Sequence, residues 1–428
     1  MTELLREPLA AQARTLARAG EWQQAQEKLR QLIAEITGCQ ATDLTINRDQ
    51  YSLNSLNGRV TLADDRTLFF KYHHEEGEDH TIEEYYRAEL LREYGFAVDV
   101  PVFACGEPGR QILLYTIRED KRLADVCREI ETAQAWDLIE PVVKAQQRAD
   151  SAILQKTLPT LRRGSVADVV AEPIHQLFWH RLVSPNVPAG LGGRVEQFYV
   201  GKEFALAGET LSWQTLSNLH WEINGVRYPH TLRQLFLEAG TVLAPNALAM
   251  QGVVVAHGDA HNANVWFDTQ GEQPELISFD PAFAGKDIPA LIAEIKATFH
   301  NIFAHPSWLY EPAEVVDRYQ VSVRREGDTL SVTHNWQLTP LREAFLQSKG
   351  ERYWQPMLAA LKAEGWLPAN WQRIVRLALF CCPTLVLNLR PGGGSGHTPE
   401  SASLGLAIAV MLGSEGEDLF NRWLQKLV

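Results

Sequence analysis

The first part of the chain changes from a helical to a strand pattern of apolar positions. Within residues 1–37, apolar residues recur at helical spacing on both sides of Gly20, which predicts two helices joined as a hairpin. From about residue 43, short β-rich runs alternate with polar turns, and these predict antiparallel strands at 44–47, 59–62 and 67–72. A helix over 81–94, ended by Gly95, and two strands near 100–103 and 111–116 complete a predicted five-stranded sheet with one helix.

The rest of the chain has mostly helical periodicity. Residues 120–250 are interrupted by proline and glycine between positions 185 and 193 and by a hairpin signal at Asn224-Gly225. Beyond residue 290 we expect the chain to return to helix, with the clearest segments at 291–303, 338–345 and 373–387 and a last helix after Gly413. A sheet-rich part followed by a helical part predicts the α+β class.

Composition and charge narrow the classes of partner. The 428 residues are 45% hydrophobic and 22% charged, as in ordinary globular proteins of more than one structural unit. The formal net charge of −13 argues against general binding to nucleic acid or to anionic lipid, because both would be repelled. We therefore expect no nucleic-acid partner and no membrane partner.

Cysteine usage and the N-terminus predict a cytoplasmic protein. No stretch is apolar for the eighteen or so residues that a spanning helix needs, and the first residues lack the order of a signal peptide. The cysteines are odd in number and include no CxxC pair, so we expect free thiols and neither disulfides nor a zinc site. They are Cys39, Cys105, Cys127, Cys381 and Cys382.

The segment His257-Gly258-Asp259-Ala260-His261-Asn262-Ala263-Asn264 carries the chemistry of the chain. It follows the short apolar run 253–256, which predicts a buried strand that ends at the segment. Phosphoryl transfer needs a carboxylate near the attacking hydroxyl and separate oxygen ligands for magnesium, and an Asp-x-x-x-x-Asn loop supplies both. Asp259 is the predicted catalytic residue and Asn264 a predicted metal ligand.

A second metal ligand follows sixteen residues later. The runs 265–267 and 275–279 flank a polar turn and predict a hairpin that returns Asp280 to the neighbourhood of Asn264. Magnesium uses few protein carboxylates and completes its shell with phosphate oxygens and water, which suits an Asn264 and Asp280 pair. ATP or GTP is then the expected co-substrate, with Mg²⁺ as the cofactor.

These motifs resemble those of the aminoglycoside phosphotransferase and choline kinase superfamily, which shares the protein-kinase fold. The loop from His257 to Asn264 matches the family's catalytic loop, with Gly258 where protein kinases have arginine, and the segment 279–287 resembles its metal segment. The chain departs from the family in two places: the family often has an aromatic residue after the aspartate that corresponds to Asp280, and a further aspartate where this chain has Pro289-Ala290-Leu291. The resemblance implies a bilobal fold and transfer of the γ-phosphate to a hydroxyl of a small molecule, such as an aminoglycoside, an amino alcohol or a sugar.

The resemblance also divides the chain. Residues 1–40 would form an N-terminal helical appendage that packs or dimerises, 41–118 the nucleotide-binding lobe, and 119–428 a catalytic and substrate-binding lobe with an insertion around 150–250. Lys71, at the end of an apolar strand, takes the place of the kinase lysine that contacts the phosphates. Counting back from Gly95, as family helices suggest, gives Glu84 as its partner, with Glu83 and Glu89 as alternatives.

Weaker assignments complete the predicted nucleotide site. The segment 51–58 resembles the family's phosphate-covering loop, and an ordinary turn at Asn57-Gly58 explains the same residues. Order along the chain places the hinge that faces the base at 114–117. The predicted contacts are Ser52, Asn54, Ser55, Thr116 and Ile117.

Two other functions fit the same motifs. A protein Ser/Thr kinase is disfavoured by Gly258 and by the lack of an Ala-Pro-Glu signature after Asp280. A non-catalytic nucleotide-binding pseudokinase is disfavoured because lysine, aspartate and asparagine are all present at the expected places. The glycine-rich segment 392–396 lacks the lysine of a P-loop and predicts a loop that leads into a helix capped by Thr398.

Overall fold

The fold is described by a computed structural model of the chain. It describes residues 8–47, 55–73, 81–105, 107, 110–183, 191–304 and 308–428; the side chains of residues 18, 55, 73 and 81–86 lie outside the description. By contacts the chain divides into two compact units. The first unit contains residues 1–120 and 277–282, and the second contains 121–276 and 283–428.

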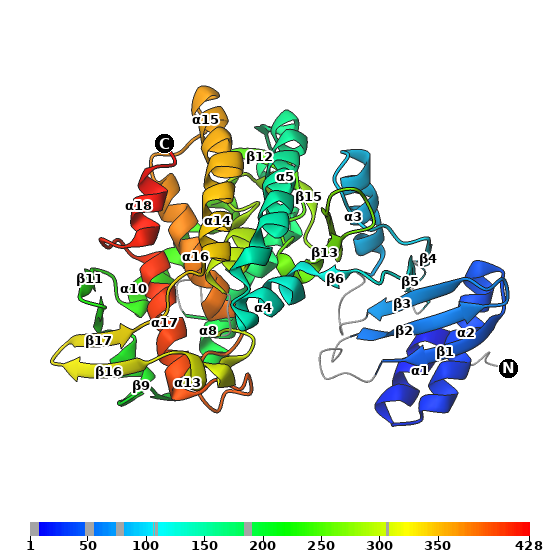
Figure 1. The fold of residues 1–428 in the computed structure, drawn as a ribbon, viewed down its shortest axis with the longest axis horizontal. Helices are drawn as coiled ribbons and strands as arrows, with labels where there is room; N and C mark the ends of the chain where they lie inside the picture. Colours follow the sequence, from blue (N-terminus) through cyan, green and yellow to red (C-terminus); the bar gives the residue numbers. More distant parts are fainter. Residues whose placement is uncertain are drawn as a thin grey trace. The chain divides into compact units, whose positions relative to one another are not determined.

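The first unit is built on an antiparallel five-stranded sheet, as predicted (Figure 1). The strands lie in the order β1-β2-β3-β5-β4, and each neighbouring pair is antiparallel. The strands are β1 (Ala41–Ile46), β2 (Ser55–Leu62), β3 (Thr67–His73), β4 (Phe103–Cys105) and β5 (Ile112–Thr116). The predicted helix is α3 (Thr81–Glu93), which ends just before Gly95 at a φ of 78°.

The predicted N-terminal hairpin is present and packs on this sheet. Helices α1 (Leu9–Arg18) and α2 (Trp22–Thr37) meet at Gly20, whose φ of 80° suits a residue without a side chain. Apolar residues of α2 such as Leu29 and Leu32 lie in one buried cluster with Leu44 and Val60 of the sheet. The hairpin therefore covers a face of the sheet and closes the core of the first unit.

The second unit is mainly helical. Its helices are α4 (Leu123–Ala133), α5 (Ile139–Thr157), α6 (Val166–Ala171), α7 (Trp179–Leu182), α8 (Gly193–Phe198), α9 (Trp213–Leu216), α10 (Leu232–Val242), α11 (Pro245–Leu248), α12 (Ile295–Thr298), α13 (Val315–Arg318), α14 (Pro340–Lys349), α15 (Gln355–Ala363), α16 (Trp371–Val386), α17 (Pro399–Gly413) and α18 (Leu419–Gln425). Helix α17 is buried along almost its whole length and packs against α16 at the centre of the unit (Figure 1). As predicted, it begins after the cap Thr398.

Two π-helical turns interrupt the helices of the second unit. One, η5 (Phe299–Phe303), continues α12, and the other, η7 (Gly350–Trp354), joins α14 to α15. The sequence predicts one helix over 291–303, whereas the structure has a short α-helix that widens into a π-turn. Such turns are frequent at functional sites because they alter which side chains reach a neighbouring segment.

Short strands are inserted among the helices. The strands are β6 (Lys121–Arg122), β7 (Arg162–Arg163), β8 (Glu203–Ala205), β9 (Thr210–Ser212), β10 (His220–Ile223), β11 (Val226–Tyr228), β12 (Gly252–Ala256), β13 (Val265–Asp268), β14 (Glu275–Ser278), β15 (Gly285–Pro289), β16 (Val321–Glu326) and β17 (Thr329–His334). The hairpin at Asn224-Gly225 is confirmed, and both turn residues have positive φ. The chain returns to helix beyond residue 290, as predicted, but the prediction missed β16 and β17, which form a hairpin that extends the sheet of β10 and β11.

The α+β class is confirmed by these elements: an antiparallel sheet dominates the first unit and helices dominate the second. Among the described residues, none of the helices is both long enough and apolar enough to cross a membrane.

Candidate active site

A buried strand delivers the candidate catalytic loop, as predicted. All five residues of β12 are buried, and the strand pairs antiparallel with β15 on one side and with β7 on the other. A strand fixed on both edges gives the next residues a rigid starting point. The loop from His257 to Asn264 begins directly after it and ends in a turn of 3-10 helix at Asn262–Asn264.

Gly258 lets the loop turn sharply. Its φ is 78°, and a Cβ atom placed there would lie 2.8 Å from the carbonyl oxygen of Phe283. Both the left-handed backbone and the close approach exclude a side chain at this position. The glycine is therefore required by the path of the chain.

Hydrogen bonds within the loop bring Asp259 and Asn264 together. The backbone amide of His261 donates to the carbonyl of Asp259 at 2.8 Å, and that of Asn264 donates to the carbonyl of His261 at 2.7 Å. The side-chain amide nitrogen of Asn264 also donates to the Asp259 carbonyl, at 3.1 Å. The spacing of five residues is thus converted into a closed turn that holds the two predicted site residues side by side.

The loop is also held from outside by the π-turn η5. The amide of Asn262 donates to Oδ1 of Asn301 at 2.8 Å, and both residues are buried. His300 directly precedes Asn301, and the centroid of its ring lies 4.9 Å from the centroid of the His261 ring. Sequence reasoning missed Asn301 and His300, because a π-turn cannot be distinguished from an α-helix by apolar spacing.

A buried lysine lies beside the Asp259 carboxylate. The side chain of Asp259 is 13% exposed, and its Oδ1 lies 3.8 Å from Nζ of Lys296 and 3.9 Å from Nε2 of His261. Burial lowers the pKa of Lys296, and the nearby negative charge of Asp259 acts in the opposite direction. Lys296 was also missed, although a single lysine in the apolar run 291–299 is a sequence signal that such a residue serves a purpose.

In the first unit, the structure brings together Lys71 and Asp280. Nζ of Lys71 donates to Oδ1 of Asp280 at 2.9 Å, and the two side chains are 18% and 40% exposed. The segment Ile277–Ala282 is held to this unit by backbone hydrogen bonds between Ser278 and residues Ala97 and Asp99. Asp280 has a φ of 54°, a left-handed conformation that aspartate adopts more readily than most residues.

The other predicted nucleotide contacts are only partly described. Ser52 and Asn54 lie outside the described residues; Ser55 begins β2 and Glu83 and Glu84 lie on α3, but their side chains are outside the description. Glu89, the third choice for the lysine partner, forms an ion pair with Arg92 on the same helix. Thr116 is the last residue of β5, and Ile117 follows it.

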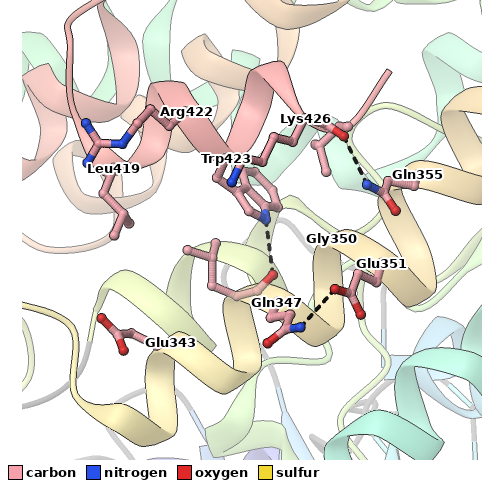
Figure 2. A pocket seen from close by; sticks show the side chains of 11 residues that line it. Glu343, Gln347, Gly350, Glu351, Gln355, Leu419, Arg422, Trp423 and Lys426 are labelled. Carbon is pink, nitrogen blue, oxygen red and sulfur yellow. Dashed lines mark hydrogen bonds between the residues drawn. The ribbon is translucent and has the colours of Figure 1, made fainter.

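A separate hollow of about 390 Å³ lies near the C-terminus of the second unit, against α14, η7 and α18 (Figure 2). In Figure 2, the indole nitrogen of Trp423 donates to the carbonyl of Leu346 at 3.1 Å, and Gln347 donates to Glu351 at 2.9 Å. These bonds join its walls to one another. Its lining includes no residue of the loop from His257 to Asn264, so the hollow is distinct from the candidate active site.

Within the described ranges, no group of three or more His, Cys, Asp or Glu side chains is placed to hold a metal ion. The donor set of the predicted magnesium site consists instead of one amide and one carboxylate. Asn264 uses its side-chain nitrogen in the loop, so its carbonyl oxygen, the atom suited to a hard cation, is not the atom engaged in that bond. A cation held by an amide oxygen and a carboxylate would take most of its ligands from phosphate and water.

Comparison with known proteins gives only distant likenesses. No protein-family model matches the sequence, and no curated protein matches it. Among solved structures, the chain is similar to a putative fructosamine-3-kinase from Thermobifida fusca YX-ER1, with 11% identity, a TM-score of 0.39, and coverage of 90% of this chain and 97% of that one.

Two further solved structures are similar over comparable lengths. A microcompartment-associated aminopropanol kinase has 14% identity and a TM-score of 0.37, covering 89% of this chain and 94% of its own. A macrolide 2'-phosphotransferase type I has 16% identity and a TM-score of 0.36, covering 90% and 94%. Likeness at these identities and scores is too distant to support a conclusion about activity, which therefore rests on the residues of this chain.

Proposed function

We propose that the chain is a phosphotransferase that moves the γ-phosphate of ATP or GTP to a hydroxyl group of a small molecule, with magnesium as its cofactor. The observation that carries the proposal is the closed turn in which the Asn264 side chain is bonded to the carbonyl of Asp259 at 3.1 Å, directly after a buried strand. This turn supplies one carboxylate for the acceptor and one amide oxygen for the metal. An aminoglycoside-, amino alcohol- or sugar-like acceptor follows from the sequence resemblance.

Each residue has a distinct role in this proposal. Asp259 accepts a hydrogen bond from the acceptor hydroxyl and takes its proton as the new bond to the γ-phosphorus forms and the bond to the β–γ bridging oxygen breaks. Asn264 and Asp280 would hold magnesium, which when bound neutralises charge on the β- and γ-phosphates. Lys71, whose Nζ donates to Oδ1 of Asp280, would contact the phosphates.

The proposal is tested by screening hydroxylated metabolites and aminoglycosides for consumption of ATP or GTP. We expect one class of acceptor to stimulate nucleotide consumption, and addition of EDTA to abolish it, because the phosphates then lose their counter-charge. Phosphate transferred to the acceptor is detected by mass spectrometry. Tight nucleotide binding without magnesium-dependent turnover would instead identify a pseudokinase, and transfer to protein serine or threonine alone would identify a protein kinase.

Replacement of Lys71 by methionine is expected to weaken ATP binding by about 10- to 100-fold. A hydrogen bond from a charged donor contributes about 1.5–3 kcal/mol, and methionine preserves the length of the side chain while removing the charge. Binding is measured by titration calorimetry. The matched control is Lys28→Met, which removes one positive charge from α2 of the same unit and should bind ATP like the unmodified protein. Equal affinity of the two variants would contradict the role of Lys71.

A further inference from the structure

Lys296 is a buried cation whose role the loop motif does not explain. It is 4% exposed, and the residues around it on α12 and η5 are also buried. Its Nζ lies 2.8 Å from Nε2 of His300 and 3.8 Å from Oδ1 of Asp259. Lys296 and His300 are therefore hydrogen-bonded. Lys296 and Asp259 form an ion pair whose atoms are too far apart for a direct hydrogen bond.

The contacts of His300 fix the direction of this network. An ammonium group has only donors, so Lys296 donates to Nε2 of His300, and we assign the proton of the neutral imidazole to Nδ1. Nδ1 lies 2.8 Å from the hydroxyl oxygen of Tyr310 and donates to it. The contacts run from Asp259 to Lys296, then to His300 and finally to Tyr310. They hold the Lys296 ammonium on the Oδ1 side of the Asp259 carboxylate.

Burial disfavours the charged form of Lys296. Burial and the positive charges of Arg181 and Arg194 lower its pKa, whereas the negative charge of Asp259 raises it. Cys382, also nearby, contributes little charge, because burial raises the pKa of its thiol to about 12. A methionine would fill the same volume without desolvating a cation, so packing alone gives no reason for a lysine at this position.

We propose that Lys296 is a positioning residue for the phosphotransfer proposed above: its ammonium, held by His300, orients the Asp259 carboxylate by drawing Oδ1 toward itself. The other carboxylate oxygen is then presented to the acceptor hydroxyl. Lys296 acts through Asp259 and does not contact the nucleotide. The inference rests on the proposed function, since it assigns a partner to the residue that receives the proton.

The test compares Lys296→Met and Lys296→Arg with the unmodified protein and with Asp259→Ala. The probe is Mg²⁺-ATP with water as the acceptor, so that no acceptor need be identified. We expect the methionine variant to lower kcat by about 10- to 100-fold with KM for ATP unchanged, as for loss of one preorganised electrostatic contact. The arginine variant, which keeps the charge, should recover part of this loss.

Thermal unfolding separates positioning from a merely structural role. The midpoint of Lys296→Met should stay within about 4 °C of the unmodified protein, because the side-chain volume is preserved. The burial-matched control is Lys349→Met, which removes another buried lysine, one bonded to Asp150 and Glu294. This control should unfold at a lower temperature yet keep kcat when assayed below its midpoint.

A second variant keeps the test decisive if Lys296→Met fails to fold. His300→Leu removes the acceptor for the ammonium and should lower kcat by about 2- to 10-fold at constant KM. The proposal is overturned by a normal kcat in the Lys296 and His300 variants, by an equal loss in the methionine and arginine variants, or by a rise in KM for ATP alone. If the unmodified protein neither hydrolyses ATP nor transfers phosphate, the proposed function itself fails; if only Asp259→Ala is impaired, the inference alone fails.

Discussion

Replacement of Asp259 by alanine is expected to lower turnover by about 10²- to 10⁴-fold, the usual contribution of a positioned general base. Asp259 directly follows Gly258, and its carboxylate faces Lys296. The lysine predicted to bind the phosphates, Lys71, belongs to the other unit. ATP affinity should therefore be preserved within about two-fold. Steady-state kinetics with the identified acceptor, together with calorimetric titration of ATP, measures both quantities.

The matched variant is Asp259→Asn, which preserves the shape of the side chain but cannot take a proton at neutral pH. It should be nearly as inactive as the alanine variant. A second control, Asp317→Ala, removes a carboxylate from α13 and should keep full turnover. Wild-type turnover in both Asp259 variants would remove this residue from the reaction.

The largest effect on stability is expected at Arg342. Its guanidinium is fully buried and bonded to both carboxylate oxygens of Glu131 at 2.7 and 2.8 Å, and also to the carbonyl of Asn301 at 2.7 Å. Replacement by methionine would leave Glu131 as a buried unpaired charge, so the free energy of unfolding should fall by about 3–5 kcal/mol. Urea denaturation monitored by tryptophan fluorescence measures the change.

The double variant Glu131→Leu with Arg342→Met separates the ion pair from packing. Removing both charges abolishes the penalty for an unpaired carboxylate, so much of the lost stability should return. Equal destabilisation by the single and the double variants would show that packing around Arg342 dominates. Because Asn301 also accepts from Asn262, the Arg342 variant should in addition lower kcat through a less firmly held catalytic loop.

Local patterns were sufficient to predict most strands of the first unit. Most strands are short apolar runs between turn residues, and sequential neighbours often pair, so reading the runs in order predicts most of the sheet. The turn from Asp259 to Asn264 was equally accessible, because the bonds that close it join residues within five positions of one another. In both features, the residues that contact one another are also close together in the sequence. The turn expected at Asn57-Gly58 is wrong, because both residues lie within β2 and pair with β3.

Features that depend on distant contacts could not be predicted in this way. Strand β17 pairs in parallel with β10, more than a hundred residues earlier, and the polar surface residues of β16 hide its alternation. Asn301 contacts the loop from a π-turn, which apolar periodicity does not distinguish from an α-helix, and Lys296 contacts it from the preceding helix α12. The partner of Lys71 among Glu83, Glu84 and Glu89 depends on helix rotation, which a weak apolar face leaves open.

The short segment Ile277–Ala282 has a consequence for how the molecule can be divided. It belongs to the first unit although the residues before and after it belong to the second, so the polypeptide crosses between the units three times, at 120/121, 276/277 and 282/283. A single proteolytic cut at 276/277 or at 282/283 leaves residues 1–120 covalently joined to part of the second unit, whereas a cut at 120/121 separates them from it. A fragment that ends at residue 120 would keep Lys71 and lose Asp280, so its sheet would carry the lysine without its acidic partner.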